Sequence, residues 1–163
     1  MNGITLTLRA LHHGERQLAK DLVVVAERHS TEHEVHHVAK DLVTWSNVAC
    51  VRLAEAADHY GLALDGPAHT STSGFAPTLR EKTAGSLGHR PEPGLLLLMD
   101  LRDIHLAAAG NSLYWEMLAQ AGQAAKDERL LDLATACHPQ TLRQMRWANT
   151  MIKNLSPQVL TSL

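Results

Sequence analysis

The chain has 163 residues, a formal net charge of −2 and 45% hydrophobic residues, which suits one domain, residues 1–163, with a buried core. Aromatic residues make up only 4% of the chain, and Leu and Ala are abundant, which favours helices packed by aliphatic side chains over sheets. No run of five or more basic residues occurs, so charge gives no support for a nucleic-acid or membrane-surface partner.

The N-terminus and the cysteines indicate the cellular compartment of the protein. Residues 1–13 lack a charged region followed by an apolar core, so we predict no signal peptide. The apolar run at 95–99 is too short to span a bilayer. Cys50 and Cys137 fall inside helical patterns and form no Cys-x-x-Cys, which favours buried thiols over a disulfide. We therefore expect a cytoplasmic protein that needs no membrane.

The first expected helix covers residues 5–28, with Thr5 as its N-cap. Its apolar side chains recur at steps of three and four, the pattern of an amphipathic helix. They are Leu8, Leu11, Leu18, Leu22 and Val25.

The second expected helix covers residues 32–60. Ser30 or Thr31 can cap it, Glu34 completes a capping box with Thr31, and Gly61 ends it as a C′ glycine. The break between the first two helices is so short that they should be antiparallel neighbours.

Between residues 61 and 94 the helical spacing of apolar residues is lost, although residues 76–84 could form a short helix. This connection is long enough to traverse a bundle, so the next helix could start at the far end and run parallel to the second.

Two further helices are expected at residues 95–125 and 128–154, separated by a break at Lys126 and Asp127. Pro139 should kink or split the last helix, and Pro157 should follow its end.

One member of the first apolar stripe is a carboxylate, Glu15. A Glu in a bundle core costs several kcal/mol unless it is paired, protonated or bound to metal. The alternative is that Glu15 turns to the edge of the stripe and reaches water. His12 lies three residues earlier, and we expect it to form a hydrogen bond with Glu15 inside the bundle or to share a metal with it.

The segment LRALHHGERQLAKDL, with Glu15 facing inward, resembles the first helix of ferritin-like proteins. Residues 101–160 resemble the second half of uncharacterised bacterial ferritin-like proteins. The resemblance implies an all-α, ferritin-like antiparallel four-helix bundle with a long crossover between the second and third helices. In the di-iron members, two helices each supply one Glu and two each supply Glu-x-x-His.

This chain departs from that ligand pattern. Glu15 matches the first carboxylate, but the Glu34-x-x-His37 match should lie roughly 15 Å or more away along the bundle axis. Residues 44–48, which should be level with Glu15, include no acid. Glu116 flanks the third stripe, and the last helix offers His138 without Glu-x-x-His. We therefore predict that the standard di-iron centre is absent.

Histidine is over-represented, with eleven residues, several of them near the first break. His33 and His37 are one helical turn apart, a common pitch for zinc or nickel ligands; the alternative is a solvated helix start. His105 and His138 are interpreted as hydrogen-bonded core histidines. The tryptophans are interpreted as core or groove aromatics: Trp45, Trp115 and Trp147.

Three functions from different classes follow. The first is a binding or structural module that is not an enzyme, forms a homodimer and could have a further protein partner. The second is a redox or storage protein that binds iron, manganese or zinc at a non-standard centre. The third is a DinB-type metal-dependent hydrolase or transferase, against which the missing late His-x-x-x-His argues. The candidate metal ligands are Glu15, His12, Glu34, His37, His33, Glu116 and His138.

Overall fold

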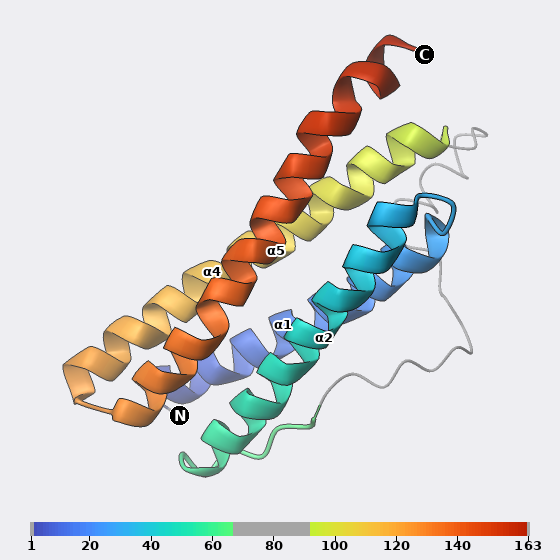
Figure 1. Ribbon diagram of the computed structural model, residues 1–163. Coiled ribbons are helices and arrows are strands. Elements are labelled where there is room, and N and C mark those ends of the chain that lie inside the picture. Colours follow the sequence, from blue (N-terminus) through green and yellow to red (C-terminus); the bar gives the residue numbers. More distant parts are fainter. Residues whose placement is uncertain (1, 67–91, 163) are drawn as a thin grey trace.

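The computed structural model describes residues 2–66 and 92–162, which form four helices and no strand (Figure 1). The helices are α1 (Gly3–Arg28), α2 (His33–Asp58), α4 (Pro93–Ala125) and α5 (Glu128–Thr161). The all-α class is confirmed. The short helix expected at 76–84 lies outside the described residues.

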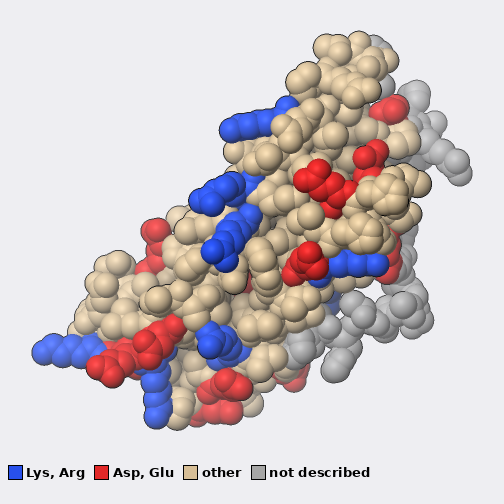
Figure 2. All heavy atoms as spheres, in the orientation of Figure 1, with Lys and Arg blue, Asp and Glu red and all other residues tan. Residues whose placement is uncertain are grey.

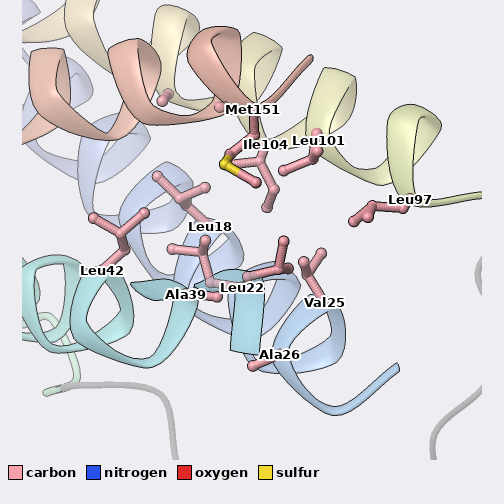
Figure 3. Close-up of a cluster of buried hydrophobic side chains, with 13 residues drawn as sticks. Leu18, Leu22, Val25, Ala26, Ala39, Leu42, Leu97, Leu101, Ile104 and Met151 are labelled. Atoms are coloured by element: carbon pink, nitrogen blue, oxygen red, sulfur yellow. The ribbon is translucent and has the colours of Figure 1, made fainter. Parts of the chain in front are cut away.

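Two clusters of buried aliphatic side chains fix the direction of each helix. One joins the end of α1 and the start of α2 to the start of α4 and the end of α5, through Val25, Ala39, Leu97 and Met151 (Figure 3). The other joins the opposite ends of the same helices. Consequently α1 and α5 run one way and α2 and α4 the other, so that α2 ends and α4 begins at opposite ends of the molecule (Figure 1).

The helices are arranged in the cyclic order α1, α2, α5, α4. The sequential pairs α1–α2 and α4–α5 contact each other most, α1 packs on α4, and α2 and α5 contact each other least. This thin α2–α5 contact determines where a pocket forms.

Every apolar residue of the predicted α1 stripe is buried, and Leu8, Leu11, Leu18 and Leu22 have no exposed surface. The inner face of α4 is buried as well. Its members are Leu97, Leu101, Ile104, Ala108, Trp115 and Leu118.

The helix starts correct two predictions. The first helix begins at Gly3, because Asn2 rather than Thr5 is its N-cap and accepts a hydrogen bond from the Thr5 backbone N–H at 2.9 Å. The capping box with Glu34 is wrong as well, because α2 begins at His33 and Glu32 is its N-cap, with no side-chain cap hydrogen bond.

The turns that follow α2 and α4 each contain a left-handed residue. At Gly61, φ is +69°, the Gly61 N–H donates to Asp58 O and the Leu62 N–H to Ala57 O, at 3.2 and 3.0 Å. This is the Schellman pattern, so the predicted C′ glycine is confirmed, although the helix itself ends at Asp58. Lys126, with φ 53°, occupies the equivalent position between α4 and α5.

The expected end of the last helix at residue 154 is wrong, since α5 continues through both prolines to Thr161. Each proline frees only the carbonyl four residues before it, and those carbonyls belong to the exposed residues Thr135 and Lys153, where water can reach them. The helix is therefore not split at Pro139.

Charged groups of both signs are interspersed over the face of the molecule that Figure 2 shows. Within residues 2–66 and 92–162, no helix has the apolar length that a bilayer crossing requires.

Candidate functional site

Glu15 lies between the two aliphatic clusters with 1% of its surface exposed. One of its oxygens, Oε1, accepts hydrogen bonds from Trp115 Nε1 at 3.1 Å and Thr141 Oγ1 at 3.3 Å. Ser46, on α2, also lowers the pKa of this carboxyl group. One carboxyl group of α1 thus accepts hydrogen bonds from α4 and α5, and its burial shows that the alternative in which Glu15 reaches bulk water is wrong.

The expected hydrogen bond between His12 and Glu15 is not formed. The ring Nε2 of His12 lies instead at the backbone oxygen of Asp65, beyond the end of α2. Trp115 and Thr141 already donate to the carboxyl group, and the His12 ring contacts Asp65 instead. Burial lowers the pKa of His12, against the smaller raising effect of the Asp65 hydrogen bond.

Burial dominates the electrostatics of Glu15. Desolvation raises the pKa of its carboxyl group above 4.5, and the hydrogen bonds from Trp115, Ser46 and Thr141 lower it by less. All three donors are neutral, so none supplies the positive charge that would stabilise a buried carboxylate. The protonated form of Glu15 is therefore more favoured than in water.

A polar layer surrounds this carboxyl group. Gln144 is 1% exposed and donates through Nε2 to Ser46 Oγ at 2.9 Å and to Leu42 O at 3.1 Å. Ser112 Oγ is 2.8 Å from His138 Nε2. The buried amide nitrogen of Asn111 has no hydrogen-bond partner within the described part of the chain.

A pocket of about 290 Å³ lies between α2 and α5 and reaches Glu15. Its walls are mainly apolar, and Arg52, an exposed residue, is at its rim. The full lining is Glu15, Trp45, Val48, Ala49, Arg52, Ala136, Cys137, Gln140, Thr141 and Gln144. A concave apolar site with a few convergent polar groups is the usual form of a small-molecule site.

The two thiols near this layer are free and buried, as predicted. Burial raises the pKa of Cys50 to about 12, with a further contribution from Glu15. Burial also raises the pKa of Cys137, although the nearby Arg52 opposes the shift. Both groups are therefore held in the poorly nucleophilic thiol form.

The histidines near the first turn are divided between surface and interior. His33 and His37 are exposed, with stacked rings whose centroids are 6.3 Å apart, and Glu34 is exposed beside them. By contrast, His29 is 6% exposed, and its Nε2 is 2.8 Å from Asp100 Oδ2. His33 and His37 therefore belong to a solvated helix start, whereas His29 is buried.

The remaining candidates form no hydrogen bond with Glu15. Glu116 is exposed on α4, and His138 is half-buried beside Ser112. Within residues 2–66 and 92–162, no three His, Cys, Asp or Glu side chains are grouped so that they could hold a metal ion. His105 Nδ1 lies 3.1 Å from the backbone oxygen of Met145, so His105 and His138 are hydrogen-bonded histidines as predicted.

Sequence reasoning missed the partners of Glu15. Thr141 lies on the buried face of α5, and Ser46 falls in the stretch 44–48 that should be level with Glu15. A small polar residue at a core position of α2 and of α5 was the available signal. The chain matches no protein-family model, no curated protein and no solved structure.

Proposed function

We propose that this protein is a ferritin-like binding module whose α2–α5 pocket takes a small organic molecule through a basic nitrogen. One observation carries the proposal: Glu15 is a buried carboxyl group at a pocket, held only by neutral donors. A buried carboxylate is costly without a paired positive charge. A ligand ammonium group at Glu15 would supply that charge and displace the carboxyl proton.

The pocket lining supports an organic rather than a bare inorganic cation. Trp45 offers an aromatic face suited to an ammonium group. Val48, Ala49 and Ala136 suit a short alkyl or aryl body. Arg52 at the rim would favour a ligand with a negatively charged group at its other end.

We also propose a family and an oligomeric state for this protein. The two antiparallel helix pairs, with α2 and α4 running in the same direction, support membership of the ferritin-like superfamily. The module is proposed to act in the cytoplasm as a homodimer, without nucleic acid. Iron, manganese or zinc at Glu15 is the alternative occupant, and a DinB-type metal-dependent enzyme would require a histidine site.

The test begins with protein purified without a His-tag, as wild type, Glu15→Gln and the surface control Glu116→Gln. Iron, manganese and zinc are measured by elemental analysis. Thermal unfolding is then followed with hexylammonium, its neutral isostere 1-hexanol and the zwitterion 6-aminohexanoate. A ligand that binds only the folded state raises the melting temperature.

Hexylammonium should raise the melting temperature of the wild type and of Glu116→Gln more than 1-hexanol does, and 6-aminohexanoate should raise it at least as much. Glu15→Gln should abolish the difference between amine and alcohol. Equal effects of amine and alcohol, or an amine effect that survives in Glu15→Gln, would overturn the proposal. Near-stoichiometric metal that is lost in Glu15→Gln would replace it with the metal-binding alternative.

A further inference from the structure

The outward face of α4 is unusually apolar for a surface. Leu106, Leu113 and Met117 point away from the core and are 54%, 59% and 55% exposed. Gly110 lies between them, and a Cβ built on it meets nothing within 4 Å. No other described helix carries three large apolar side chains this exposed along one face. We call these four residues the outer stripe.

Because α4 also buries its inner face, it is apolar around most of its circumference. A helix of that kind is normally covered on both sides. An exposed apolar face of this length is typical of a protein interface.

The order of large and small residues along α4 makes the outer stripe complementary to itself. In an antiparallel pair of α4 helices crossing between Asn111 and Ser112, Leu113 meets Gly110 of the partner subunit. In the same register, Leu106 meets Met117 of the partner subunit. Large side chains therefore face a gap or another flexible apolar chain, as interdigitated packing requires.

The charges flanking the outer stripe select this orientation. In a parallel pair, Arg102, Asp103 and Glu116 would each face their own copy, so like charges would be opposed. In the antiparallel register, the opposite positions are occupied by Ala121, Gln120 and Ala107, so these repulsions are absent. The preference therefore rests on charge as well as on shape.

We propose that the outer stripe is the site at which a second copy of this chain docks, with the two α4 helices antiparallel about a two-fold axis. The inference specifies the homodimer included in the proposed function, but it uses no property of Glu15. The outer stripe faces away from the core on α4, whereas the pocket lies between α2 and α5, so docking leaves the pocket accessible.

The test measures the molar mass in solution of the full-length chain by light scattering after size exclusion. The variants are Leu113→Glu and Gly110→Lys, with Leu142→Glu as the control. Leu142 is an exposed leucine on α5, 40% exposed and outside the outer stripe. Circular dichroism confirms that each variant keeps its helix content.

Wild type and Leu142→Glu should have twice the mass of the chain, and each outer-stripe variant should fall to the mass of one chain. Mixing Leu113→Glu with Gly110→Lys should restore the dimer, because Glu and Lys then meet across the axis while the unaltered Gly110 and Leu113 meet at the symmetry-related position. A monomeric wild type, a dimeric Leu113→Glu, or a mixture that stays monomeric would overturn the proposal. Thermal shifts with hexylammonium in the monomeric variants report separately on the pocket.

Discussion

The indole nitrogen of Trp115 lies 3.1 Å from Oε1 of Glu15, and the two side chains are 0% and 1% exposed. This hydrogen bond joins α1 to α4 at the centre of the bundle. It provides a donor to a carboxyl group that burial has removed from water. Trp115, the largest fully buried side chain of the core, therefore also donates a hydrogen bond to Glu15, the only buried glutamate among the described residues.

Replacing Trp115 by Phe keeps an aromatic ring but removes the donor to Glu15. We expect a loss of about 1–3 kcal/mol in the free energy of unfolding at neutral pH, because a buried polar group loses a partner. Urea unfolding monitored by circular dichroism measures it. The matched control is Trp147→Phe, since the buried Nε1 of Trp147 has no hydrogen-bond partner in the described chain. Equal losses in the two variants would contradict the role of the Trp115 hydrogen bond.

The pH dependence of stability tests the protonation of Glu15. Its pKa in the folded state is raised above 4.5 by burial. The folded protein then holds a proton that the unfolded chain has released, so this group lowers stability as pH rises from 4.5 to the folded pKa. The free energy of unfolding of Glu15→Gln, relative to that of wild type, should therefore increase with pH in this range and then level off.

Urea unfolding at a series of pH values, with Glu116→Gln as the surface control, measures that difference. The control should follow the wild type throughout. A Glu15→Gln advantage that shrinks with rising pH would show that the folded pKa is lowered instead.

Much of the fold was predictable because its helices bury regular stripes. Leu8, Leu18 and Leu101 occupy core positions that their spacing alone indicates. The helix ends were less predictable. The start of α1 depends on Asn2, one residue among several polar ones, and α5 passes Pro157 because the carbonyl freed by this proline belongs to the exposed residue Lys153.

The site was predictable only in its central residue. Glu15 stands out because it interrupts an apolar stripe. Its partner was assigned by closeness in the chain, to His12, whereas the actual donors Trp115 and Thr141 are 100 and 126 residues away. The pocket itself depends on the thin contact between α2 and α5, which no local pattern encodes.

Gly14 marks a close approach of α1 to α4. A Cβ at this position would lie 2.1 Å from Asn111 Oδ1, so Gly14→Ala should cost about 1–3 kcal/mol through overpacking. In an Asn111→Ala background the Asn111 side chain no longer blocks the added Cβ. Gly14→Ala should then raise the free energy of unfolding by roughly 0.5–1 kcal/mol through helix propensity. A double-mutant cycle by urea unfolding measures both effects. Equal effects in the two backgrounds would contradict the contact.

Lys126 occupies a left-handed conformation at the α4–α5 turn, with φ 53°. A side chain with a Cβ is strained there, so Lys126→Gly should raise the free energy of unfolding by about 1 kcal/mol. Lys126→Ala removes the same long side chain but keeps the Cβ, and should give no such gain. Thermal unfolding of the two variants provides the comparison, and an equal gain in both would locate the effect in the lost charge.

The central claim is that burial raises the pKa of Glu15 and that a cation in the pocket lowers it, and the most direct test is the titration of Glu15 itself. In protein labelled with ¹³C-glutamate, the Glu15 Cδ resonance is identified by its loss in Glu15→Gln and followed with pH, with and without hexylammonium. We predict a midpoint above 4.5 in the free protein that moves downward when the amine is present. A midpoint at or below 4.5, or one that hexylammonium leaves unchanged, would contradict the claim.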